Sequence, residues 1–116
     1  MAELRFDLAV IARELQGSRD KTVLDVGCGD GALMAALRDE SGIDARGIEI
    51  DPEQVAKCVA RGLSVVQGDA NRDLAEYPDD AFDYTVLGQT LQTSMRPDRT
   101  LEELLRISAT AVVSFP

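Results

Sequence analysis

Apolar positions along the chain follow two alternating patterns, short β-branched runs and longer stretches with helical spacing. The short runs stop at glycine or polar residues and predict five strands, at Thr22–Val26, Arg46–Ile50, Leu63–Val66, Phe82–Leu87 and Ala111–Phe115. In the longer stretches apolar residues recur every three or four positions, as on the buried face of a helix. These stretches predict helices at residues 5–16, 31–40, 52–61 and 98–107.

The helix at 52–61 has clear signals at its start. Asp51 is a favourable N-cap, Pro52 suits the first helical position, and Gln54 completes the spacing of a capping box. Cys58 and Val59 fall on the apolar stripe of this helix, so we expect both side chains in the core.

Strands that alternate with helices predict an α/β fold with a parallel sheet and right-handed crossovers. We expect one domain over residues 1–116, with an N-terminal helix at 5–16 and a core at 20–116. The predicted architecture is a Rossmann-like three-layer sandwich whose five strands lie in the order 3-2-1-4-5. In such sheets ligands bind beyond the carboxyl ends of the strands, where the strand order reverses.

The first predicted strand runs into the loop Asp25-Val26-Gly27-Cys28-Gly29-Asp30-Gly31. Three alternating glycines before a helix bring bare backbone close to a ligand, although a tight turn without a ligand is the alternative. The spacing is GxGxG, whereas the dinucleotide fingerprint is GxGxxG, which disfavours NAD. We expect a nucleoside with an amino-acid tail, whose ammonium faces Asp25. We expect Cys28 to contact the ligand as part of this loop, as a small residue between glycines and not as a nucleophile.

Glu49 ends the second predicted strand, 18 residues after Gly31. A carboxylate at this place accepts hydrogen bonds from both hydroxyls of a ribose, and the alternative is a solvated glutamate beside a helix start. Ile50 offers an apolar face to an adenine ring. Asp51 is better explained as the helix cap than as a ligand contact.

Two more candidate contacts follow the third and fourth predicted strands. We expect Asp69 to accept a hydrogen bond from the adenine amino group, and the backbone at Ala70 to bond to the edge of the ring. The alternative is that the Asp69 side chain only stabilises a turn of this chain. Gly88 and Gln89 follow the fourth strand, where a small residue leaves room for the amino-acid tail of the ligand.

Composition limits the remaining functions. The chain has 116 residues, 45% of them hydrophobic, and no apolar run approaches the roughly 20 residues that span a membrane. We therefore expect no membrane association and a cytoplasmic location. A net charge of −9 disfavours nucleic-acid binding. Two cysteines without any histidine cannot complete a zinc site, and the commonest general base is missing.

Four phrases together resemble the class I S-adenosylmethionine-dependent methyltransferases: VLDVGCGDG at 23–31, GIEID at 47–51, QGDA at 67–70 and FDYTVLGQTLQ at 82–92. GQTLQ and VARGLSVVQGD are similar, more narrowly, to the methionine biosynthesis protein W (MetW) family. The resemblance implies S-adenosylmethionine as cofactor, bound by Asp25, Gly27, Gly29, Glu49 and Asp69. It also implies a role in methionine synthesis alongside homoserine O-acyltransferase.

The resembling families continue beyond the fifth strand into two further strands, whereas this sequence stops at Pro116. We therefore expect the last two strands of the full methyltransferase fold to be missing and strand five to be an open edge. Such an edge predicts a homodimer formed through this strand.

Three functions stay open. The chain transfers a methyl group to a small molecule, or it is a non-catalytic, cofactor-binding partner of homoserine O-acyltransferase, or it is a nucleotide-dependent oxidoreductase. The glycine spacing disfavours the third. The sequence identifies no catalytic residue and no metal ligand.

Overall fold

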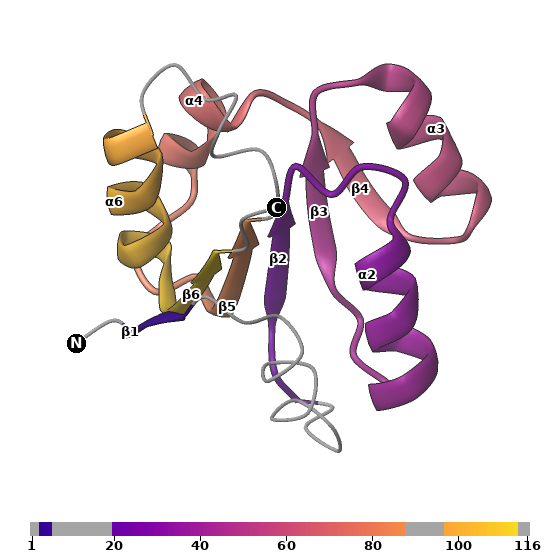
Figure 1. Ribbon diagram of the computed structural model, residues 1–116, viewed down its shortest axis with the longest axis horizontal. Coiled ribbons are helices and arrows are strands. Elements are labelled where there is room, and N and C mark those ends of the chain that lie inside the picture. The colour runs from indigo at the N-terminus through magenta and orange to yellow at the C-terminus, as the bar shows by residue number, and fades with distance from the viewer. Residues whose placement is uncertain (1–2, 6–19, 88–96, 114–116) are drawn as a thin grey trace.

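A computed structural model describes residues 3–5, 20–87 and 97–113 of the chain (Figure 1). Six strands form one sheet in the order β1-β6-β5-β2-β3-β4, and every neighbouring pair is parallel. The strands are β1 (Glu3–Arg5), β2 (Val23–Val26), β3 (Arg46–Glu49), β4 (Ser64–Gln67), β5 (Phe82–Leu87) and β6 (Ser108–Val113). Among the described residues, no helix is both long and apolar enough to cross a membrane.

Helices cover both faces of this sheet (Figure 1). On one side lie α2 (Ala32–Ala36), the π-helical turn η1 (Leu37–Ser41) and α3 (Pro52–Ala60). On the other side lie α4 (Ala70–Asp73), the 3-10 turn η2 (Leu74–Glu76) and α6 (Pro97–Ile107).

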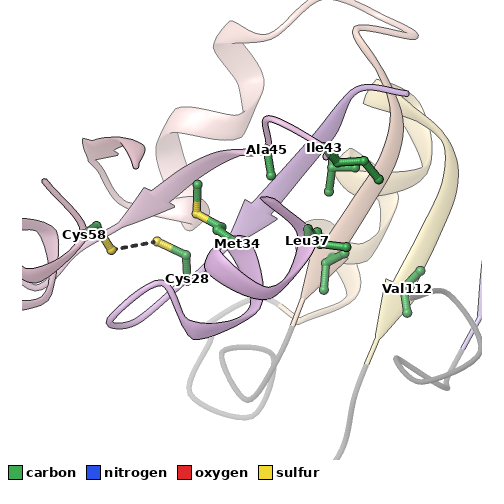
Figure 2. Packing of buried hydrophobic residues seen from close by; sticks show 9 residues of the cluster. Cys28, Met34, Leu37, Ile43, Ala45, Cys58 and Val112 are labelled. Atoms are coloured by element: carbon green, nitrogen blue, oxygen red, sulfur yellow. Dashed lines mark hydrogen bonds between the residues drawn. The ribbon is translucent and has the colours of Figure 1, made fainter. Parts of the chain in front are cut away.

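Each face has its own apolar core, because successive side chains of a strand point to opposite faces. Val23 of β2 and Val112 of β6 belong to the core beneath α2 and α3, part of which Figure 2 shows. Their neighbours Leu24 and Val113 belong to the core beneath η2 and α6. The three layers of the predicted sandwich therefore follow from alternation along buried strands.

The predicted strand order is confirmed, since strands 3-2-1-4-5 of the sequence correspond to β4-β3-β2-β5-β6. The predicted helix at 5–16 is wrong at Arg5, which belongs to β1, and its other residues lie outside the described part of the chain. The open edge at strand five is also wrong, because β1 pairs with β6 from Thr110 to Val112. Because the backbone of β6 is already paired with β1 along these residues, an open edge at strand five no longer supports the predicted homodimer.

Three local predictions also need correction. The helix predicted at 31–40 changes to a π-helical turn after Ala36. Val59 lies outside the core, with 61% of its surface exposed, whereas Cys58 is fully buried as expected. The fifth strand begins at Ser108, three residues before the predicted start, because α6 runs directly into β6.

Candidate functional site

The glycine loop after β2 is bonded to the end of the neighbouring strand β3. The backbone N–H groups of Gly27 and Cys28 both donate to the carbonyl oxygen of Ile48, at 2.8 and 3.2 Å. Gly27, Gly29 and Gly31 have φ values of 68°, 58° and 84°, in the left-handed region that favours glycine. A Cβ atom added to Gly29 would meet no other atom within 4 Å. One side of the loop backbone therefore faces open space, as the sequence predicts for a ligand-binding loop.

Glu49 holds this loop in place. Its Oε1 accepts a hydrogen bond of 2.7 Å from the N–H of Gly29, and its Oε2 accepts one of 2.9 Å from the N–H of Asp51. The Glu49 carbonyl oxygen also accepts the N–H of Gly68, at 3.0 Å. A carboxylate has about four acceptor positions, so each Glu49 oxygen keeps one for a further donor. Glu49 is 9% exposed, and the interpretation as a solvated glutamate is therefore wrong.

The same contacts correct the predicted capping box of α3. Asp51 is the N-cap as expected, since its Oδ1 accepts the N–H of Glu53 at 2.9 Å. The Asp51 N–H donates to Glu49 and not to Gln54. Gln54 Oε1 is buried and has no hydrogen-bond partner among the described residues. Glu49 thus completes the helix start while it orders the glycine loop.

Asp25 is the most deeply buried carboxylate near this loop. It lies in β2, pairs with Gly47 of β3 and is 4% exposed. No described residue donates a hydrogen bond to its side chain. Burial, and secondarily the negative charge of Glu49, raise the pKa of Asp25 to about 7. A cation placed beside this group would favour its charged form, which fits the expected contact with an ammonium.

An open depression of about 410 Å³ lies next to Glu49, beyond the ends of β3 and β4. Its lining residues are Ile50, Gln67, Gly68, Asp69 and Arg72. Ile50 is 61% exposed, so its apolar side chain is open to a ligand in this depression. The predicted adenine contacts Ile50 and Asp69 are therefore brought to one hollow.

Asp69 caps α4, a helix that the sequence did not predict. Its Oδ1 accepts a hydrogen bond of 2.9 Å from the N–H of Asn71. This oxygen therefore has the local structural role that the alternative interpretation assigns to Asp69. Ala70 is half-buried and packs on the core beneath α6. Gln67 and Arg72 also line the depression and were not predicted. The one signal for them in the sequence is the spacing of Arg72, three residues after Asp69, which is one helical turn.

Two other predicted roles have different outcomes. Gly88 and Gln89 lie outside the described residues, so their predicted place beside the methionine portion stays a prediction. Cys28 is buried, and that burial, followed by the charge of Asp25, raises the pKa of its thiol. Thiolate is therefore scarce, which disfavours a role as the nucleophile of a rapid catalytic cycle. Within residues 3–5, 20–87 and 97–113, no group of three or more side chains is arranged to hold a metal ion.

Comparisons with known sequences identify the family of this chain. Residues 5–116 match the family described as Methionine biosynthesis protein MetW. The chain is 37% identical over 103 residues to the Bifunctional methionine biosynthesis protein MetXA/MetW of Rhodopirellula baltica, covering 82% of this chain and 16% of the relative. The chain thus spans about a sixth of that relative's length.

Two solved structures have a similar fold. A chain from the structure described as "Complex between the Haloferax volcanii Trm112 methyltransferase activator and the putative methyltransferase" is 33% identical, with a TM-score of 0.69 (80% of this chain, 41% of that chain). The [4+2]-cyclase SpnF is 30% identical with a TM-score of 0.70 (87% and 40%). The sheet order and these similar structures show the Rossmann-like fold of methyltransferases. From the family match and the 37% identical relative, this chain belongs to the MetW family of methionine biosynthesis proteins.

Proposed function

We propose that the chain binds S-adenosylmethionine at the carboxyl ends of β2, β3 and β4. The observation that carries this proposal is the placement of two carboxylates, Asp25 and Glu49, beside an open glycine backbone at Gly29. An adenosyl amino acid offers matching groups, a cationic amine and a pair of ribose hydroxyls. Similarity to a methyltransferase of the same fold supports this choice of ligand.

In this arrangement each end of the ligand has its own protein contact. Asp25 faces the ammonium, which offsets the cost of keeping a buried carboxylate charged. Glu49 accepts the ribose hydroxyls with the positions left free by Gly29 and Asp51. The adenine ring lies on Ile50, and Asp69 accepts its amino group within the open depression.

Titration calorimetry with S-adenosylmethionine tests this proposal. Glu49→Ala is expected to weaken binding by about 1–3 kcal/mol, or roughly tenfold to a hundredfold. Glu53→Ala is the matched control, because Glu53 is exposed in the first turn of α3 and its removal changes the net charge equally. Equal affinity of wild type and Glu49→Ala, or an equal loss in both variants, would contradict the proposal.

A pair of smaller ligands separates ribose recognition from loop anchoring. Adenosine carries both ribose hydroxyls, whereas 2′,3′-dideoxyadenosine has neither. If Glu49 accepts the hydroxyls, Glu49→Ala costs clearly more affinity for adenosine than for dideoxyadenosine, because the loss for dideoxyadenosine reports only the loosened Gly29 loop. A loss of equal size for both ligands would mean that Glu49 acts only through the Gly29 loop.

The bound cofactor has two candidate roles. Methyl transfer to a small molecule needs mainly the alignment of donor and acceptor, so the absence of histidine is compatible with it. A non-catalytic role as partner of homoserine O-acyltransferase is favoured by the relative whose name joins MetXA and MetW in one protein. SpnF has a similar fold and a name that describes a cyclase, so the fold alone does not specify methyl transfer.

Two measurements on the same preparation distinguish these roles. Labelled methyl from S-adenosylmethionine that appears in a small-molecule product supports the enzyme. Stable co-purification with homoserine O-acyltransferase, without label transfer, supports the partner. The Glu49→Ala variant serves as the binding-deficient control in both measurements.

A further inference from the structure

The only two cysteines of the chain approach each other beneath the glycine loop. Cys28 lies in the loop and Cys58 in α3, yet their Sγ atoms are 4.0 Å apart, and Figure 2 shows the two side chains pointing toward each other. Both residues are buried, Cys28 at 9% exposure and Cys58 at 0%. Cys58 Sγ–H also donates to the carbonyl oxygen of Gly29, at 3.2 Å. The thiol pair therefore contacts the same loop residue that Glu49 holds.

We propose that Cys28 and Cys58 are a reversible oxidation site, and that their disulfide lowers the affinity of the loop for its adenosyl ligand. The second part of this statement rests on the proposed function. The first part depends only on the sulfur geometry and can be tested without any ligand.

Hydrogen peroxide supplies a balanced route to the disulfide. The Cys28 sulfur, the more exposed of the two, attacks one peroxide oxygen; the O–O bond breaks, a sulfenic acid forms and one water leaves. The Cys58 sulfur then attacks the Cys28 sulfur, the S–S bond forms, and the sulfenic oxygen leaves as a second water with the Cys58 proton. Two thiols lose two electrons in total, and peroxide is reduced to two waters.

Burial sets the speed of this reaction. Burial raises the pKa of both thiols, and at Cys28 the negative charges of Asp25 and Glu49 raise it further. At Cys58 the charges of Asp30 and Asp25 also raise the pKa, whereas that of Arg61 lowers it. Thiolate is therefore scarce at neutral pH, and oxidation is slower than at an exposed cysteine. A small oxidant such as peroxide reaches these sulfurs more readily than a bulky disulfide does.

Closing the bond alters the loop. A disulfide holds its sulfurs about 2.05 Å apart, so the pair must approach by roughly 2 Å from its present separation. Cys58 also loses the S–H that donates to Gly29. Because α3 is already packed tightly below Gly31, where an added Cβ would lie 3.0 Å from Cys58 Sγ, we expect the loop to move more than the helix. That movement shifts Gly29 away from Glu49 and disturbs the proposed ribose contact.

The test begins with mass spectrometry of peroxide-treated wild type after alkylation of free thiols. The expected product lacks two hydrogens, resists alkylation and yields a peptide that joins Cys28 to Cys58. Dithiothreitol is expected to restore both thiols. Cys58→Ser is the control: its hydroxyl keeps a donor for Gly29, but Cys28 has no resolving thiol and proceeds to irreversible sulfinic acid. Sulfinic acid at Cys28 in the wild type, without the joined peptide, would overturn the oxidation site.

Calorimetry with S-adenosylmethionine then tests the effect on binding. Cross-linked wild type is expected to bind at least about tenfold more weakly than reduced protein and to recover after reduction. Unoxidised Cys58→Ser, which keeps a donor for Gly29, is expected to bind within about twofold of reduced wild type. If serine prevents folding, recovery of the wild-type affinity after dithiothreitol is the control. Unchanged affinity after cross-linking overturns the effect on binding. Failure of the reduced wild type to bind contradicts the proposed function and this effect together, while the mass spectra still decide the oxidation site.

Discussion

The Glu49 carboxylate accepts a hydrogen bond of 2.7 Å from the backbone N–H of Gly29, which links the end of β3 to the glycine loop after β2. The second carboxylate oxygen accepts the N–H of Asp51 at the start of α3. A ribose that binds Glu49 must therefore share it with the backbone groups that shape the site. Loop order and ligand binding are coupled through this one side chain.

Replacement of two glycines of the loop by alanine is expected to have different effects, on ligand binding at Gly29 and on stability at Gly31. At Gly29 the added Cβ meets no atom within 4 Å, so the stability cost comes only from its φ of 58°, about 1–2 kcal/mol. The Cβ would, however, project into the space proposed for the ligand. We expect Gly29→Ala to lose S-adenosylmethionine binding while remaining folded, as measured by calorimetry and urea unfolding.

Gly31→Ala is the contrasting variant. Its Cβ would lie 2.5 Å from Leu63 Cδ1 and 3.0 Å from Cys58 Sγ. Overpacking adds about 1–3 kcal/mol to the cost of a positive φ, so this variant should be clearly less stable than Gly29→Ala. Equal stability of the two variants would contradict the packing described for Gly31.

The buried carboxyl of Asp25 is expected to make stability fall as pH rises. Its pKa is raised to about 7 in the folded protein, whereas an unfolded aspartate titrates near 4. Between these values the folded state binds more protons, so the contribution of Asp25 is greatest below about pH 4 and is lost progressively up to about pH 7. The slope approaches about 1.4 kcal/mol per pH unit.

Asp25→Asn isolates this effect from the other titrating groups. Urea unfolding at pH 5 and pH 8 is expected to show the variant gaining stability over wild type at the higher pH. Asp44→Asn, at an exposed carboxyl, serves as the control and should show no such gain. A difference between Asp25→Asn and wild type that does not change with pH would show that Asp25 titrates normally.

Ligand affinity is expected to change with pH in the opposite direction. An ammonium interacts favourably only with ionised Asp25, so affinity for S-adenosylmethionine should rise up to about pH 7, by at most roughly tenfold per pH unit. Calorimetry between pH 5.5 and 8 measures this dependence. Asp25→Asn should bind weakly and without the trend; a wild-type affinity that is constant across this range would argue against the ammonium contact.

Asp51→Ala separates helix capping from ligand contact. The variant loses the acceptor for the Glu53 N–H, which costs about 1 kcal/mol of stability. It keeps the backbone N–H that donates to Glu49, so S-adenosylmethionine affinity should change by less than about threefold. A loss of tenfold or more would make Asp51 a ligand contact, contrary to its assignment as a cap.

The centre of the sheet could be predicted from the sequence because β2 is buried along its whole length and appears as an apolar run that stops at the glycine loop. The edge strand β4 is largely exposed, and its Val65-Val66 pair was enough to predict it. β1 could not be predicted, because three residues carry no usable periodicity and its pairing with β6 joins the two ends of the chain. α4 was missed for a similar reason, since its four residues are too few to show a helical face.

The site was predicted as a set of residue types but not as a set of contacts. The sequence identifies Glu49 as an acceptor beyond a strand end, yet it does not show that the Gly29 and Asp51 N–H groups already use it. The proximity of Cys28 to Cys58 was missed as well. It depends on how α3 packs against the glycine loop, which is a tertiary contact between residues 30 positions apart.

Amide chemical shifts of nitrogen-15-labelled protein, titrated with S-adenosylmethionine, test the central claim most directly. We predict shifts concentrated at residues 27–31, 49–50 and 68–70, with little change at residues 104–108, where α6 runs into the start of β6 at the opposite end of the sheet. A folded protein whose spectrum is unchanged at millimolar ligand, or whose shifts fall away from the ends of β2, β3 and β4, would contradict the claim.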